Sequence, residues 1–247
     1  MMADVTLLQY AAVAATAVVA SIIGGVTGYG TGLLMPLVLV PIIGAQAVVP
    51  VISVSALLTN GSRLVAYWSS FDARKALLVG CAAVPLCIVS AYGYTLLSGP
   101  NAALVIGLVL IALVPLRRIL KARFGALSER GLVLSGVGYG ALVGGTSGSG
   151  VILLSILMAG GLEGAAVIAT DAGVSLLIGT IKALVFQTAG ALPWSSWIMA
   201  LLIGTCAMPG AFIARALTRN LSLTTHAYIL DAVVIVGGVL LVAQALR

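Results

Sequence analysis

The sequence predicts an all-α polytopic membrane protein built from two inverted repeats, each with a broken or re-entrant glycine-rich helix and about three spanning helices. Three observations carry this prediction. Of the 247 residues, 62% are hydrophobic and only 7% are charged, which is too little charge to cover the surface of a soluble domain. A glycine-rich stretch recurs at a fixed offset along the chain, and most of the basic residues are confined to short loops.

A glycine-rich stretch interrupts an apolar run in each half of the chain. The first, GGVTGYGTGLLMP, covers 24–36, and the second, GGTSGSGVILLSI, begins at Gly144, 120 positions later. In this register glycines and a Leu-Leu pair recur, and Thr27 is matched by Ser147. A general glycine bias would not preserve the register through the leucines. The match therefore predicts an internal duplication, with a first repeat over 1–120 and a second over 121–247.

Apolar segments of about 20 residues, the length that crosses a bilayer as a helix, recur in both halves. The glycine-rich segments 5–43 and 131–160 are interrupted, and the two pieces of the second are too short to cross individually. We expect each of these segments to enter the membrane and return, as a re-entrant hairpin or a helix broken at mid-depth. The expected continuous spans are 46–69, 76–97, 101–119, 162–189, 194–214 and 223–246.

The basic residues predict the orientation of the chain in the cell inner membrane. Nine of the twelve fall in three loops, which the positive-inside rule places in the cytoplasm. Counting crossings between these loops gives the two halves opposite orientations, with the N terminus outside. A run of eight single-pass helices, which would make the duplication parallel, is the competing topology. The three groups are Arg74 with Lys75, then Arg117, Arg118, Lys121, Arg123 and Arg130 in a linker over about 117–130, and Arg215 with Arg219.

The composition also excludes several classes of function. The net charge of +6 arises from short loops between apolar segments, so nucleic acid is not an expected partner. The chain has a single His and lacks the H-E-x-x-H, G-x-S-x-G and P-loop motifs, so we do not expect an enzyme or an ATP-driven pump. The spacing of Cys81, Cys87 and Cys206 fits neither a metal site nor a disulfide framework, and we expect no cofactor. The expected partners are a small anionic substrate and membrane lipid, and a homodimer is left open.

The glycine-rich breaks have the features of an anion site. Non-helical backbone is tolerated inside a bilayer only where it is buried in protein or lines a cavity, so we expect the two breaks to meet. An apolar, helix-like run follows each break, so a helix N-terminus with free N–H groups and a positive dipole end faces it. The alternative is that the glycines only allow tight helix packing. The expected substrate contacts in the breaks are Gly28, Tyr29, Gly30, Thr31, Ser147, Gly148, Ser149 and Gly150.

Two basic residues lie inside predicted spans, Arg63 and Lys182. They are 119 positions apart and so occupy nearly equivalent places in the two repeats. Each lies about 10 Å from the nearer end of its span and is expected to bind substrate from its own side of the membrane. Arg63 offers two parallel hydrogen bonds to a sulfonate or carboxylate, whereas Lys182 supplies a point charge. The alternative is that both side chains snorkel to the membrane interfaces.

Asp171 is the one acid well inside an apolar segment, and three interpretations of it stay open. It is a candidate carrier of a coupling proton, because burial favours the protonated form of a carboxyl group. It is also a candidate counter-ion for Lys182, although about 16 Å of helix excludes a direct contact between them. A structural hydrogen bond between helices is the third interpretation. The other polar side chains expected to line the cavity are Thr27, Ser53, Asn60, Tyr67, Thr146 and Ser175.

The paired breaks resemble the glycine-rich segments of the TauE/SafE sulfite exporter family, also called the TSUP family. The family pattern is close to G-x-G-G-G near the end of the first break, followed by a Leu-rich run and often a proline. Gly28 and Gly30 keep this pattern, and Pro36 matches the proline. Tyr29 and Thr31 stand where the family often has glycines. The resemblance covers essentially the whole chain through its length, its duplication and its basic central loop.

The resemblance implies transport of sulfite, thiosulfate, sulfonates and related oxyanions. The aromatic ring of Tyr29 and the hydroxyl of Thr31 favour a substrate with an organic part, such as a small sulfonate or carboxylate, over bare sulfite. We therefore predict a secondary anion transporter that works by alternating access, with Asp171 as the candidate for proton coupling. A passive anion channel on the same scaffold is the alternative.

Overall fold

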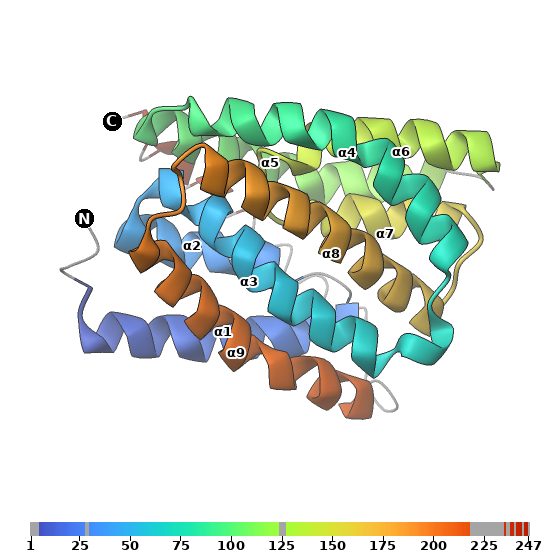
Figure 1. Cartoon of the computed structure of the whole chain (residues 1–247), viewed down its shortest axis with the longest axis horizontal. Coiled ribbons are helices and arrows are strands. Elements are labelled where there is room, and N and C mark those ends of the chain that lie inside the picture. The colour runs from blue at the N-terminus through green and yellow to red at the C-terminus, as the bar shows by residue number, and fades with distance from the viewer. Residues whose placement is uncertain are drawn as a thin grey trace.

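A computed structural model describes residues 5–27, 30–123 and 127–217, together with isolated residues between 235 and 246. Within these residues the chain folds into helices and forms no strand, which confirms the predicted all-α class (Figure 1). The elements are α1 (Leu7–Thr27), α2 (Thr31–Ile43), α3 (Ala45–Ala66), the short 3-10 helix η1 (Trp68–Ser70), α4 (Ala73–Thr95), α5 (Gly99–Arg123), α6 (Glu129–Val143), α7 (Gly150–Ala159), α8 (Ala165–Thr188) and α9 (Trp194–Leu217).

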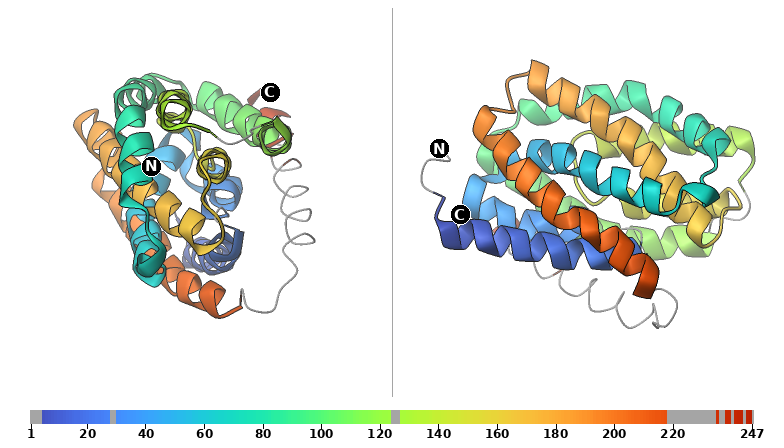
Figure 2. Two further views of the ribbon diagram at one scale, coloured as in Figure 1. Left: turned by 90° about the vertical axis from the view of Figure 1, so that its right-hand side faces the viewer. Right: turned by 60° about the horizontal axis from the view of Figure 1, so that its bottom comes forward.

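Five helices in the described part of the chain are long and apolar enough to cross a membrane, namely α1, α3, α4, α8 and α9. They lie side by side along the long axis of the molecule, as both views in Figure 2 show. The bounds of α3, α4, α5, α8 and α9 agree with predicted spans to within a few residues. The span predicted at 223–246 lies almost wholly outside the described residues.

Each glycine-rich segment folds as two helices separated by a break, but the two segments differ in length. The helices of the second segment are short, with 15 residues in α6 and 10 in α7. In the first segment α1 has 21 residues, about 30 Å of helix, and can cross the membrane alone. The first segment is broken as expected, but its break follows a helix long enough to span, and the depth of the break in the membrane stays a prediction. The length of α1 follows from its sequence, because no glycine or proline interrupts α1 before Gly24.

The order of the helices recurs between the two halves of the chain. Helices α7, α8 and α9 begin 119 to 121 positions after α2, α3 and α4 respectively. Both α1 and α3 pack on α9, while both α6 and α8 pack on α4, so exchanging the halves preserves this pattern. The equivalent helices α3 and α8 also pack on one another, and Figure 1 shows that they run in opposite directions. These features support inverted repeats, whose insertion in a membrane and whose boundary at 120/121 stay predictions.

The loops assigned to one side of the membrane lie at one end of the bundle. Arg74 Nη2 lies 2.7 Å from Glu129 Oε1, so the starts of α4 and α6 are adjacent. The end of α9 points toward the same end of the long axis, and α1 starts at the opposite end (Figure 1). The described ends of these helices are thus arranged as the charge pattern predicts. That this end faces the cytoplasm stays a prediction.

Helix α6 packs on α4 through glycines spaced four residues apart. A Cβ atom added at Gly136 would lie 2.7 Å from the carbonyl oxygen of Val79, and one at Gly140 would lie 2.1 Å from that of Ala83. Gly144, the first glycine of the second break, continues this row against α4. Tight helix packing, the alternative interpretation of the glycines, therefore holds for this row.

We expect Gly140→Ala to lower the free energy of unfolding by about 1–3 kcal/mol, because the added methyl group meets the backbone of α4. Gly138→Ala is the matched control on the same helix, since nothing lies within 4 Å of a Cβ at that position. Alanine favours helix over glycine, so the control should be neutral or slightly stabilising. Thermal unfolding of both variants in detergent measures the difference, and equal melting temperatures would contradict the packing described here.

Candidate functional site

The two glycine-rich breaks meet inside the bundle. Ser147 Oγ, in the second break, donates a 2.6 Å hydrogen bond to the carbonyl oxygen of Gly32, just after the first. A Cβ atom at Gly32 would lie only 2.7 Å from the backbone nitrogen of Gly148. Gly148 itself has a φ of +82°, in the left-handed region that favours glycine. Glycine at these two positions is thus required by the close approach of the segments.

The helices that follow the breaks both begin at this junction. Helix α2 begins at Thr31 after Gly30, and α7 begins at Gly150 after Ser149. Neither N-cap residue, Gly30 or Ser149, provides a side-chain cap. The first N–H groups of a helix lack partners within it and carry the positive end of its dipole. Two such ends at one junction favour negative charge there.

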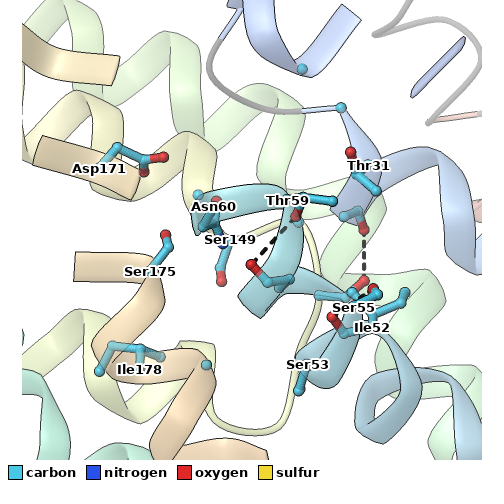
Figure 3. A pocket seen from close by; sticks show the side chains of 18 of the residues that line it. Thr31, Ile52, Ser53, Ser55, Thr59, Asn60, Ser149, Asp171, Ser175 and Ile178 are labelled. Carbon is cyan, nitrogen blue, oxygen red and sulfur yellow. Dashed lines mark hydrogen bonds between the residues drawn. The ribbon is translucent and has the colours of Figure 1, made fainter. Parts of the chain in front are cut away.

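A cavity of about 130 Å³ lies at the junction, bounded by the breaks and by helices α3 and α8. Figure 3 shows hydroxyl, amide and carboxylate groups from these elements around it. A volume of this size exceeds what one water molecule needs and suits a small polar solute. The predicted site residues that line it are Gly30, Thr31, Ser53, Asn60, Arg63, Thr146, Ser147, Gly148, Ser149, Gly150, Asp171, Ser175 and Lys182.

The remaining predicted residues do not extend this lining. Tyr67 belongs to a small separate cluster with Ala66 and Ala169, because it lies a full turn beyond Arg63, where α3 has already ended. Its expected place on the cavity is therefore wrong. Gly28 and Tyr29 lie outside the described residues, as does the side chain of Thr27.

Several residues that line the cavity were not predicted from the sequence. Helix α3 turns one face to the cavity, and this face includes Ser55 and Thr59 besides the expected Asn60 (Figure 3). The expected Arg63 lies on the same face. These positions follow helical spacing, so the periodic recurrence of polar residues along α3 was a usable signal. Other missed lining residues are small or apolar and carry no such signal. They include Ser21, Gly24, Gly32, Ile52, Ala56, Val143, Ile178, Gly179, Ala207 and Ala211, and the aromatic Tyr139.

An ion pair joins the two halves of the chain across the cavity. Arg63 Nη2 of α3 lies 3.3 Å from Asp171 Oδ2 of α8, and it also donates a hydrogen bond to Asn60 Oδ1. The side chain of Asp171 is 1% exposed, and neither of its oxygens accepts a hydrogen bond from the described residues. The counter-ion of Asp171 is therefore Arg63. The interpretation that paired Asp171 with Lys182 is wrong, because the neighbouring helix supplies the closer cation.

Lys182 binds the main chain of the second break. Its Nζ donates to the carbonyl oxygens of Val143 and Thr146, both at 2.8 Å. These carbonyls lie where α6 ends, at the negative end of that helix. Lys182 is 6% exposed, so its side chain does not snorkel to the interface. An ammonium group has three N–H donors, and the two carbonyls account for two of them.

No carboxylate in the described part of the chain forms an ion pair with Lys182, so its charge is balanced only by carbonyl dipoles. The described residues also contain no group of three or more His, Cys, Asp or Glu side chains placed to hold a metal ion. The chemistry that this lining offers is therefore electrostatic and hydrogen-bonding. Cationic groups, hydroxyls and helix N-termini converge on one small space, which is the donor set of an oxyanion site.

Comparison with known protein families agrees with this geometry. The family described as Sulfite exporter TauE/SafE matches residues 13–241, nearly the whole chain. The chain belongs to the TauE/SafE family. Neither the curated proteins nor the solved structures gave a match. TauE/SafE is a transporter family, and together with the apolar helices this makes the chain a multi-pass membrane protein. Membership of a transporter family also fits the expectation that the chain is not an enzyme.

We expect Ser147→Ala to lower the free energy of unfolding of this TauE/SafE protein by about 1 kcal/mol, because it removes the hydrogen bond that joins the two breaks. The control is Ser155→Ala, since the hydroxyl of Ser155 donates only to Val151 within its own helix. Thermal unfolding of the two variants in detergent gives the comparison. A loss for Ser155→Ala as large as that for Ser147→Ala would argue against a special role of the contact.

Proposed function

We propose that the chain is a secondary transporter of sulfur-containing or other small organic anions, such as sulfite or a sulfonate. In this proposal the anion binds in the cavity between the two breaks, and rocking of one half of the chain against the other gives alternating access from the two sides of the cell inner membrane. The buried ammonium of Lys182 carries the argument, because it lines the cavity with no carboxylate partner among the described residues. A cation held away from water is stabilised by an anion beside it.

The surroundings of Lys182 support the same proposal. The N-termini of α2 and α7 at the cavity can donate to oxyanion oxygens. Hydroxyl groups of Ser53, Ser55 and Thr59 also line the cavity, but each donates to a carbonyl of α3 and must rotate its hydrogen away from that carbonyl to donate to an anion. Arg63 reaches the cavity with part of its guanidinium already bound to Asn60 and Asp171. Substrate therefore competes with Asp171 for this group.

Proton coupling through Asp171 is part of the proposal. Anion uptake against a negative-inside potential costs about 2.3 kcal/mol per charge per 100 mV, so uptake needs a coupling ion, whereas export does not. A proton on Asp171 removes the charge that holds Arg63 and leaves the guanidinium available to the anion. The charged and titratable groups that line the cavity with Asp171 are Arg63 from α3, Tyr139 from α6 and Lys182 from α8 itself.

Reconstitution in proteoliposomes tests the transport proposal. We expect saturable uptake of labelled sulfite or methanesulfonate, lowered about tenfold or more by Lys182→Met because the buried cation is lost. Lys75→Met, at the start of α4 and away from the cavity, is the matched control and should transport as the wild type does. Flux that rises without saturation would favour the passive channel, and the absence of any anion flux would overturn the proposal.

A pH gradient across the same vesicles tests the role of Asp171. An inward proton gradient should accelerate anion uptake by the wild type, and Asp171→Asn should remove this response because its amide binds no proton in this range. Glu129→Gln changes an exposed carboxylate at the end of the bundle and should keep the response. Proton-driven uptake that survives in Asp171→Asn would remove Asp171 from the coupling mechanism.

A further inference from the structure

The lining of the cavity contains few charged side chains. Three of its described lining residues are of charged types, namely Arg63, Asp171 and Lys182. Residues 25–29 of the first break, whose side chains are not described, contain no charged type. Arg63 and Asp171 lie 3.3 Å apart and neutralise each other when both are ionised, whereas the ammonium of Lys182 donates to two carbonyl oxygens and forms no ion pair with a described carboxylate. With Asp171 and Lys182 both ionised, the described lining of the cavity therefore carries one net positive charge.

Because these side chains are buried, the net charge of the cavity lining strongly affects which anions bind. Asp171 is 1% exposed and Lys182 is 6% exposed, so water screens their charges poorly. Charge that is left unbalanced away from water carries a large desolvation cost. An anion with one negative charge brings the cavity to neutrality. An anion with two charges leaves one negative charge unbalanced in the same small space.

We infer that this cavity, with the Arg63–Asp171 pair formed, selects singly charged anions over doubly charged ones of the same shape. The ligand of the cavity in this state, with Asp171 ionised, is therefore a monoanion, such as a monosulfonate, hydrogensulfite or a small monocarboxylate. The inference rests on the proposed function, in which the cavity is the anion site. It extends the proposed function by specifying the net charge of the bound anion, which the geometry of the breaks alone does not define.

The expected size of the selection follows from Coulomb's law. One unit charge about 6 Å from another, at an effective dielectric constant of about 20, changes a binding constant by about 100-fold. The distance stands for a small anion in contact with the wall of the cavity. A preference of at least about tenfold should thus remain after relaxation of the surrounding groups.

Methanesulfonate and sulfate are the probes that isolate charge from shape. They are nearly isosteric, since a methyl group in one replaces an oxygen in the other, and near neutral pH they carry one and two negative charges. Their dissociation constants for the purified full chain in detergent can be measured by calorimetry and by thermal stabilisation. The ionic strength is held equal with a bulky anion such as gluconate. We expect methanesulfonate to bind about tenfold or more tightly than sulfate.

Variants then change the charge of the cavity one unit at a time. Asp171→Asn raises the count to two positive charges and should shift the ratio of the two constants toward sulfate by about tenfold or more. Adding Arg63→Gln to this variant returns the count to one, and the preference for methanesulfonate should return with it. Arg74→Gln removes a charge from an exposed side chain outside the cavity and should leave the ratio unchanged.

The possible outcomes separate this inference from the proposal on which it rests. Sulfate binding as tightly as methanesulfonate to the wild type overturns the inference, and leaves the cavity as an anion site. The inference is also overturned if a folded Asp171→Asn variant has the same ratio of dissociation constants for methanesulfonate and sulfate as the wild type. If Asp171→Asn does not fold, the ratio of the two dissociation constants in the wild type and in the Arg63→Gln, Asp171→Asn double variant still tests the inference. If neither anion binds or is transported, the proposed function fails together with the inference.

Discussion

A helix that breaks inside a hydrocarbon environment must find partners for the backbone groups that the break exposes, and the cavity depends on how this is done. The carbonyls at the end of α6 are bound by the ammonium of Lys182 from α8. The carbonyl of Gly32, near the start of α2, is bound by the hydroxyl of Ser147. The break therefore brings a cation and a hydroxyl into the interior. The N-termini of α2 and α7 lie beside them, and their N-cap residues, Gly30 and Ser149, provide no side-chain cap.

These contacts differ in whether they cross between the two halves of the chain. Lys182 binds carbonyls of its own half and makes α6, the second break and α8 one unit. The Arg63–Asp171 and Ser147–Gly32 contacts join the first half to the second. If the halves rock against each other, these two contacts must change, as must others between the halves such as Ser90–Gly140, while the Lys182 contacts can persist. A substrate that competes for Arg63 acts at one of the contacts that must change, so binding and movement are physically linked.

The sequence predicted features that follow from a repeated pattern, such as the paired breaks. It did not predict contacts that depend on how each helix is rotated about its axis. A fixed offset of 120 positions predicted that both breaks would be alike, and their contact follows from the need to bury them. Arg63 and Lys182, 119 positions apart, were expected to bind substrate from the two sides of the membrane, but the structure gives Arg63 a carboxylate partner and Lys182 two carbonyls. This difference in partners depends on which helices face each other, and the local sequence around Arg63 and Lys182 does not specify that arrangement. Tyr67 was misplaced for another reason, since α3 ends at Ala66, before Tyr67.

Charge balance connects the two proposals made for this cavity. With Asp171 ionised, one negative charge on the ligand brings the cavity to neutrality. With Asp171 protonated, Arg63 and Lys182 together present two positive charges, and a doubly charged anion brings the same space to neutrality. A dianion that enters with a proton therefore has the same electrostatic result as a monoanion that enters alone. The low exposure of Asp171 and Lys182 penalises every other combination, because each leaves unbalanced charge away from water. Proton coupling and selection by charge are thus two consequences of one constraint, the neutrality of a small buried site.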